Sequence, residues 1–215
     1  MPYRPELISG DECVERLRKI YREADARRTV RMFSSREVPR EAIEHAILTA
    51  GTAPSGAHLQ PWHFVAISNP ETKARIRERA EAEEKEFYVR KITPEWRAAL
   101  EPLGTDFVKA HITDAPWLIV VFRRDYDVLA DGSHRKNYYM YESVGIAVGF
   151  LIQALHRAGL ATLTHTPAPM TFLRDLCGRL MHEKPFVLLP VGFPSDDCLV
   201  PDLHRKSLQD ISEFD

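Results

Sequence analysis

The sequence predicts an α+β fold. Segments with helical periodicity come in clumps between short apolar runs, so a regular series of strand–helix–strand units is not expected. No Gly-x-Gly-x-x-Gly pattern follows a predicted strand, so a Rossmann dinucleotide site is not supported. The chain of 215 residues has no internal repeat and no linker rich in Gly or Ser. We therefore expect one domain over residues 1–215.

The first two helices are predicted from apolar spacing over residues 12–26 and 39–50. Apolar residues three or four positions apart lie on one side of a helix. Their apolar sides consist of Val14, Leu17, Ile20 and Tyr21 in the first helix and Ile43, Ala46, Ile47 and Ala50 in the second.

Two further helices begin with a capping residue followed by proline. Asn69 and Pro70 start a long charged helix that runs to about Tyr88. Thr93 and Pro94 repeat this start signal, so another helix is expected from there.

Four strands are predicted. These are residues 62–67, 117–122, 161–164 and 186–192. The run 117–122 is apolar throughout, which is typical of a strand buried on both faces. A short helix over residues 171–180 precedes the last strand.

The longest predicted helix covers residues 137–158 and ends before Gly159. It is apolar on nearly all sides and carries small residues such as Gly145 and Gly149. Such a helix is buried on all sides. Either a second subunit covers one face or the helix is the core of a monomer, and the spacing alone leaves both open.

Composition excludes several kinds of partner. The net charge of −2 gives no reason to expect nucleic acid. Cys13, Cys177 and Cys198 are odd in number and form no C-x-x-C pair, so neither a disulfide framework nor a metal site is predicted. The N-terminus is polar, and the longest apolar run, 144–152, is shorter than the ~20 residues that cross a bilayer. We expect a cytoplasmic protein with no membrane partner.

Three arginines gather within five residues, in the block Arg27, Arg28, Thr29, Val30 and Arg31. Guanidinium groups supply planar, bidentate donors that fit a phosphate dianion. Two of these arginines are four residues apart, so one turn could bring both to a single ligand. On its own the block fits a solvated basic helix end better.

A loop of small residues, Ser55, Gly56 and Ala57, is closed by Pro61 and Trp62. Its glycine lets a ligand approach the backbone closely, and its serine offers a hydroxyl. On its own it fits an ordinary connection between a helix and a strand. Together, the arginine block and this loop indicate a clamp for a phosphate-bearing aromatic cofactor.

Four blocks carry a wider resemblance. They are R-R-T-V-R at 27–31, P-S-G-A-H-x-x-P-W at 54–62, T-H-T-P at 164–167 and P-D-L-H-R-K at 201–206. In order and approximate spacing they resemble the nitroreductase-like FMN flavoproteins, in particular their iodotyrosine deiodinase branch. The resemblance implies a mostly antiparallel central sheet surrounded by helices. It also implies a domain-swapped homodimer with FMN at the interface, which favours a second subunit covering the long helix.

The resemblance also implies the cofactor site. The expected FMN-binding residues are Arg27, Arg28, Thr29, Val30, Arg31, Ser55, Gly56, Thr164, His165, Thr166 and Arg205. Thr166 falls where the family places a hydroxyl beside flavin N5, which gives it a catalytic role. His165 departs from the threonine expected there and, taken alone, fits a structural histidine. Which arginine holds the phosphate and which the flavin ring stays open.

The resemblance further implies a substrate lid over about residues 70–110 and a C-terminal arm over about 196–215. Glu84, Tyr88 and Lys109 stand at the family's intervals for binding an amino-acid zwitterion. A carboxylate suits the ammonium, and a lysine suits the carboxylate. Each of the three could singly be an ordinary surface residue. Because the segment is rich in Glu and Lys, we expect it to be mobile and to close over substrate.

The implied reaction is FMN-dependent reductive dehalogenation of halotyrosines, which turns 3-iodotyrosine into tyrosine and iodide. The backbone N–H of Ala57 would hold the phenolate oxygen. One alternative is a general NAD(P)H-dependent nitroreductase or flavin reductase. Another is a non-catalytic protein that binds flavin or halotyrosine. The electron donor, NAD(P)H or a partner reductase, stays open.

Overall fold

The computed structural model describes residues 1–215 and is built around a four-stranded antiparallel sheet. Its strands are β1 (Trp62–Ile67), β2 (Trp117–Arg124), β5 (Ala161–Thr162) and β6 (Glu183–Gly192). Their order is β1-β2-β6-β5, and every neighbouring pair is antiparallel. The predicted α+β class and the antiparallel sheet are confirmed.

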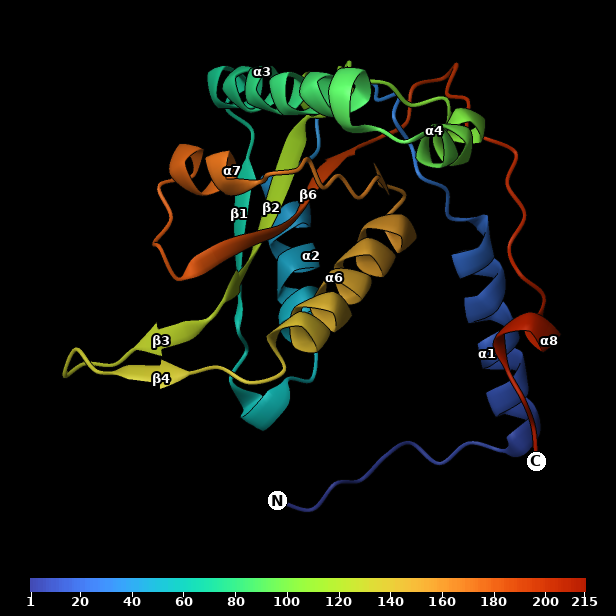
Figure 1. Cartoon of the computed structure of the whole chain (residues 1–215). Coiled ribbons are helices and arrows are strands. Elements are labelled where there is room, and N and C mark those ends of the chain that lie inside the picture. The colour runs from blue at the N-terminus through green and yellow to red at the C-terminus, as the bar shows by residue number, and fades with distance from the viewer.

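Helices cover both faces of this sheet (Figure 1). One face carries α2 (Arg40–Gly51) and α6 (Met140–Arg157), and the other carries α3 (Pro70–Glu86) and α7 (Thr171–Leu176). The remaining helices are α1 (Gly10–Ala26), α4 (Pro94–Leu100), α5 (His111–Asp114) and α8 (Leu208–Ile211). Short turns of other helix types are η1 (Gly56–His58), η2 (Phe87–Lys91) and η3 (Glu101–Leu103).

Strand β2 shows how the sequence builds two cores on one sheet. Ile119 and Val121 are buried against α2 and α6, whereas Leu118, Val120 and Phe122 are buried against α3 and α7. Successive side chains of a strand point to opposite faces, so a run that is apolar throughout serves both cores. The prediction of a strand buried on both faces is confirmed.

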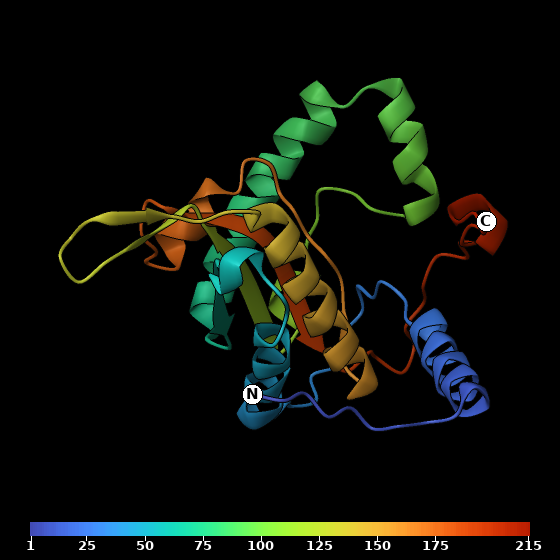
Figure 2. The same ribbon diagram turned by 90° about the horizontal axis from the view of Figure 1, so that it is seen from below.

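Helix α1 does not bury its apolar side within the chain. It has no buried residue, and Val14, Leu17 and Ile20 are exposed. The helix and the C-terminal α8 stand apart from the sheet and its covering helices in both views (Figure 2). Only the end of α1 is tied to α6, where Glu23 accepts from Arg157 Nε at 3.1 Å and Glu23 O pairs with His156 Nε2 at 2.7 Å.

Helix α6 also leaves one apolar side uncovered. Residues such as Val144 and Leu151 are fully buried in the core. On the other side Ile146 is 42% exposed and Phe150 is 41% exposed. A Cβ added at Gly149 would meet no atom within 4 Å. The predicted apolar character on nearly all sides is confirmed, but one chain buries only part of it.

The structure shortens or shifts several predicted elements. Helix α6 begins at Met140 because Tyr139 has a φ of +51°. Helix α7 ends at Leu176, two residues before Gly178 with its φ of +61°. None of the helices combines the length with the apolar character needed to cross a bilayer.

A projecting hairpin, β3 (Tyr126–Val128) and β4 (His134–Lys136), was not predicted (Figure 1). Its strands are only three residues long and mostly polar, so alternation gives little signal. The Asp131–Gly132 pair in its loop is a turn signal that could have located it.

Candidate cofactor and substrate site

The predicted arginines line one cavity of about 470 Å³. Its wall consists of Arg27, Arg28, Thr29, Arg31, Leu103, Thr164, Val200, Pro201, Leu203, His204 and Arg205. The C-terminal arm therefore meets the arginine block, although the two are far apart in sequence. Arg205 makes this connection by donating to Asp25 Oδ1 at 2.8 Å and to Arg27 O at 2.8 Å.

The guanidinium groups of Arg27 and Arg31 have no hydrogen-bond or ion-pair partner in the chain, and both side chains are partly buried. Burial lowers the pKa of Arg27, and the nearby charges of Arg205 and Arg28 lower it further. Burial is also the main cause that lowers the pKa of Arg31. An anion placed in this cavity would offset positive charge that the chain leaves uncompensated.

Val30 differs from its neighbours in the arginine block. Its N–H donates to Thr162 O at 3.3 Å, which places it beside the edge strand β5. Its side chain is buried with Phe33, Ala115 and Leu163, and it lines neither of the two main cavities. A contact between Val30 and a cofactor is therefore left to its backbone.

A second cavity of about 580 Å³ adjoins the first, because Arg31 and Thr164 lie in the walls of both. The other residues of its wall are Glu84, Phe87, Tyr88, Trp96, Leu100, Thr105, Lys109, His111, Leu163, His165, Thr166, Pro167, Ala168, Pro169 and Met170. The predicted lid residues and the predicted Thr164–Thr166 segment thus meet in one cavity.

The alternation of a strand orients residues 164–166. The N–H and C=O of His165 both pair with Leu188 of β6 at 2.9 Å, which fixes this segment against the sheet. Thr164 and Thr166 are exposed on the cavity wall, whereas His165 is buried. Neither threonine hydroxyl has a hydrogen-bond partner in the chain, so both are free to meet a ligand.

The lid residues Glu84, Tyr88 and Lys109 lie together, as predicted. Glu84 Oε2 is 3.4 Å from Lys109 Nζ, and this ammonium lies 5.5 Å from the centroid of the Tyr88 ring. Lys109 is only 3% exposed. Tyr88 belongs to the π-helical turn η2 rather than to α3 itself. Such turns occur frequently at functional sites.

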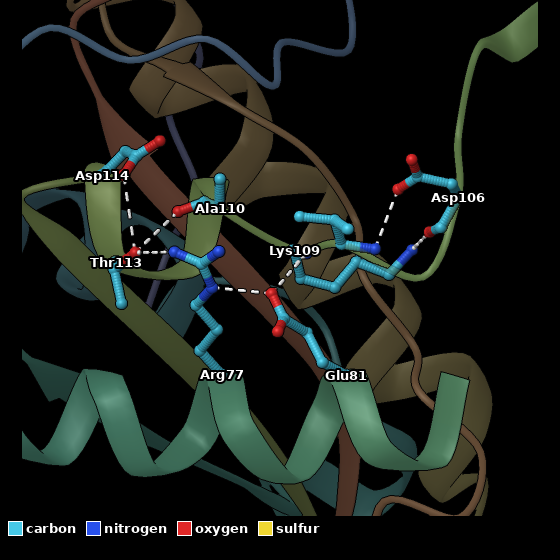
Figure 3. A network of polar contacts seen from close by, with 8 residues as sticks. Arg77, Glu81, Asp106, Lys109, Ala110, Thr113 and Asp114 are labelled. Atoms are coloured by element: carbon cyan, nitrogen blue, oxygen red, sulfur yellow. Dashed lines mark hydrogen bonds and ion pairs between the residues drawn. The ribbon is translucent and has the colours of Figure 1, made fainter. Parts of the chain in front are cut away.

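A polar network fixes the backbone that carries Lys109 (Figure 3). Glu81 Oε1 accepts from the Lys109 N–H at 2.8 Å and from Arg77 Nε at 2.6 Å. Arg77 also donates to Thr113 Oγ1 at 2.8 Å. The side chain of Lys109 donates to the carbonyl of Asp106. Helix α3 therefore holds the backbone of Lys109, which is buried and is not a free surface lysine.

Glu84 is ionised. Burial opposes its ionisation, but the hydrogen bond with His165 and the charge of Lys109 outweigh burial and lower the pKa of the carboxyl. His165 Nε2 donates to Glu84 Oε1 at 3.2 Å, so each oxygen of the carboxylate has a partner. The cavity thus holds a partly buried acid and a buried amine that neutralise each other.

Sequence reasoning did not identify the aromatic part of this cavity. Phe87 and Trp96 pack edge-to-face with centroids 4.7 Å apart, and His111 packs edge-to-face on His165 at 5.4 Å. Trp96 could have been suspected, because it is an aromatic residue at the start of a predicted helix. His111 stands in no motif, so nothing in the sequence pointed to its place in the cavity.

The loop Ser55–Ala57 lies elsewhere in the chain and lines neither cavity. It packs at the start of α6, where the Gly56 N–H donates to Ser143 Oγ at 3.2 Å (Figure 1). The close approach that Gly56 permits is to Tyr138 and Tyr139 of the same chain. The expectation that this loop and the arginines form one clamp is thus not met within one chain.

The loop nevertheless exposes an unused donor. Ala57 has a φ of +50°, and the two other non-glycine residues nearby with positive φ are His58 at +55° and Gln60 at +48°. Residues held in this region are strained and cluster at ligand sites. The Ala57 N–H has no acceptor in the chain, whereas the N–H groups of its neighbours Gly56 and His58 do.

Comparisons with known proteins agree with these features. The chain matches the nitroreductase family over residues 24–193. It is 52% identical over 206 residues to an iodotyrosine deiodinase of Haliscomenobacter hydrossis, covering 96% of this chain and 93% of the relative. It is 45% identical to an iodotyrosine deiodinase of Hydra vulgaris, covering 98% and 78%.

A solved structure of oxidised iodotyrosine deiodinase bound to FMN and 3-iodo-L-tyrosine is also similar. Its TM-score is 0.80 at 30% identity, with 91% of this chain and 98% of that chain covered. The chain therefore belongs to the nitroreductase family and, within it, to the iodotyrosine deiodinases. The resemblance drawn from the four sequence blocks is confirmed.

The tight packing of the loop makes a first prediction. Gly56→Ala should destabilise the fold by about 1–3 kcal/mol, because the new Cβ would lie 2.8 Å from Tyr139 Cδ2 and 2.9 Å from Tyr138 O. Urea unfolding of the purified protein measures this free energy. Gly51→Ala is the matched control, since its Cβ would meet no atom within 4 Å. Equal stability of the two variants would contradict the packing described for the loop.

Proposed function

We propose that this protein is an FMN-dependent oxidoreductase that removes halogen from halotyrosines, turning 3-iodotyrosine into tyrosine and iodide. One observation carries the proposal: an arginine-lined cavity adjoins a cavity that holds Glu84, Tyr88 and Lys109, and the two share Arg31 and Thr164. A phosphate-bearing cofactor and an amino acid can thus lie side by side. The names of the relatives agree with this pairing.

The residues present fit FMN. The unpaired guanidiniums of Arg27 and Arg31, together with Arg28, Thr29 and Arg205, would hold its phosphate and the polar edge of its ring. Bound FMN would supply the reducing electrons, which NAD(P)H or a reductase would replace. The free hydroxyl of Thr166 is our candidate for the hydrogen bond to flavin N5.

The ion pair of the partly buried Glu84 and the buried Lys109 would bind the amino-acid end of the substrate. The substrate ammonium would take the place of Lys109 at Glu84, and the substrate carboxylate would take the place of Glu84 at Lys109. Tyr88 would pack against the bound molecule. Because water is largely excluded from this pair, exchanging one ion pair for two favours a zwitterion. The free N–H of Ala57 would hold the phenolate oxygen, where a fixed donor stabilises negative charge.

We further propose a homodimer in which Ser55, Gly56 and Ala57 of the partner subunit complete each FMN site. Three observations support it. The loop lies apart from the arginines in one chain. Helix α6 leaves an apolar side with Ile146 and Phe150 exposed. Helix α1 and the C-terminal arm extend away from the body without covering their apolar residues (Figure 2). A second copy would bury these surfaces.

The function is tested by anaerobic titration of the dithionite-reduced, FMN-loaded protein. We expect 3-iodotyrosine to reoxidise the flavin stoichiometrically, with one tyrosine and one iodide released per flavin. A nitroarene is titrated in parallel. Reoxidation by the nitroarene but not by 3-iodotyrosine would favour a general nitroreductase, and no reoxidation by either would favour a binding protein without turnover.

Two variants separate the cofactor site from the substrate site. Glu84→Gln should weaken 3-iodotyrosine binding by about 10-fold or more, since it removes the charge that would pair with the substrate ammonium, while FMN stays bound. Arg205→Ala should weaken FMN binding, because it removes a cation and releases the C-terminal arm from Asp25 and Arg27. Flavin absorbance per chain and fluorescence quenching by ligand measure the two affinities. Similar loss of flavin in both variants would contradict the separation of the sites.

The dimer is tested on the uncovered side of α6. Gly149→Leu should raise the dissociation constant of the dimer at least about 30-fold, because the cost of overpacking, roughly 1–3 kcal/mol, counts twice across a symmetric contact. Sedimentation velocity measures this change, and bound FMN should fall with it. Gly51→Leu is the control, since Gly51 also has free space around a Cβ but lies on α2. A wild-type protein that sediments as a monomer would refute the proposal.

We also propose that part of the segment 70–110 acts as a lid. Helix α3 is anchored by the fully buried Ile76 and Ala80, so it is not expected to move. Most residues between Val89 and Val108 are exposed, including those of α4. Motion is therefore expected in this later part, around the hinge-like turn η2.

Limited trypsin digestion tests the lid. Cleavage after Arg90, Lys91 or Arg97 should slow several-fold when 3-iodotyrosine is added to the FMN-loaded protein, because closure orders the exposed backbone. Cleavage after Arg135 or Lys136, in the exposed hairpin strand β4, serves as the internal control and should not change. Equal protection at all sites, or none at the lid, would rule out ligand-driven closure.

A further inference from the structure

His165 occupies an unusual place between the lid and the sheet. Its N–H and C=O both pair with Leu188 of β6, so the ring is carried by backbone that is bonded to the central sheet. Glu84 belongs to α3 and reaches His165 across 81 residues of sequence. The ring of His165 is the sheet's contact with the acid of the proposed substrate site. His165 is 7% exposed, so its hydrogen bond with Glu84 is largely shielded from water.

The geometry fixes which nitrogen donates. An ionised carboxylate only accepts hydrogen bonds, so Nε2 of His165 must carry the hydrogen that faces Glu84 Oε1 at 3.2 Å. Nδ1 is buried and has no partner, which suits an unprotonated nitrogen better than a second N–H. Behind it lies His111, which is 5% exposed. Burial is the main cause that lowers the pKa of His111 to about 3, so this neighbour stays neutral.

The two oxygens of Glu84 therefore have different kinds of partner. Oε1 is bound to a ring whose backbone is bonded to the sheet, whereas Oε2 lies 3.4 Å from the ammonium of Lys109. When Lys109 turns to a substrate carboxylate, Oε2 loses its partner and Oε1 keeps its own. The carboxylate then presents one free oxygen in a fixed direction.

We propose that His165 is a positioning residue, which holds Glu84 so that its free oxygen meets the α-ammonium of the substrate. His165 thereby sets the preference of the site for ligands with a free α-amino group. The inference rests on the proposed function, since it assumes that the ligand is an amino acid. His165 touches neither the reacting carbon nor the halogen and acts through Glu84.

The test compares two ligands that differ only in the amino group, 3-iodotyrosine and 3-(4-hydroxy-3-iodophenyl)propionate. Both are titrated into FMN-loaded protein, and the ratio of their dissociation constants measures the recognition of the ammonium. His165→Leu should weaken 3-iodotyrosine about 10-fold or more, the usual effect of losing a hydrogen bond to a charged group. The amino-free analogue should change less than about 2-fold by the same argument, so the ratio falls.

His165→Gln is the matched variant that keeps the hydrogen bond. Its amide nitrogen stands at nearly the same distance from the backbone as Nε2, so most of the ratio should be retained. His165→Asn carries the same amide one carbon shorter and should behave like His165→Leu. If the leucine variant loses FMN, the asparagine and glutamine variants alone decide the question.

The outcomes are distinct. A wild-type protein that binds neither ligand refutes the proposed function and this inference together. A wild-type protein that prefers 3-iodotyrosine, with the same ratio in all three variants, leaves the function standing and refutes the role of His165. Equal weakening of both ligands also refutes it, because His165 would then support only the shape of the cavity.

Discussion

Positive charge that the chain does not neutralise is concentrated at one cavity of this protein. Arg27 and Arg31 are partly buried, yet neither guanidinium has a partner, and Arg28 and Arg205 add further charge at the same cavity. Holding like charges together costs free energy that an anion would offset. The C-terminal arm bends back to this point, where Arg205 bonds to Asp25 and Arg27. The cavity thus carries positive charge that the proposed phosphate would offset.

In the adjoining cavity, by contrast, the charges compensate each other within the chain. Glu84 and Lys109 would each be costly to bury alone, so they pair with each other in the absence of a ligand. A zwitterion can replace both partners at once, whereas an uncharged phenol would leave the pair as it is. The proposed recognition of an amino acid therefore rests on an ion pair already present in the protein. The network of Arg77, Glu81 and Thr113 keeps Lys109 in position for this exchange (Figure 3).

Much of this could be predicted from the sequence, because the signals were local or were carried by motifs. Strand β1 has the predicted bounds, and α3 begins at Pro70 after the capping residue Asn69, as predicted. The interval between Glu84 and Lys109 matches that of the family, and both residues line one cavity of the structure.

Other features depend on long-range packing that spacing does not encode. The exposed apolar side of α1 looks in sequence like any core-facing helix. The requirement for Gly56 comes from Tyr139, which is far away in the chain. His165 carries no sign in the sequence that its ring meets Glu84, because that contact exists only once α3 packs over the sheet.

The central claim is that arginines of one chain and the Ser55–Ala57 loop of another form a single FMN site. Co-expression of two defective chains tests it directly. One chain carries Arg31→Ala and Arg205→Ala, and the other carries Ser55→Glu, which puts a negative charge on the loop while keeping an acceptor for the Gln60 N–H. In a mixed dimer one site has both defects and the other has none, so random pairing should restore FMN binding to about a quarter of all sites. If the mixture binds no more FMN than the average of the two separate variants, each site lies within one chain and the account is wrong.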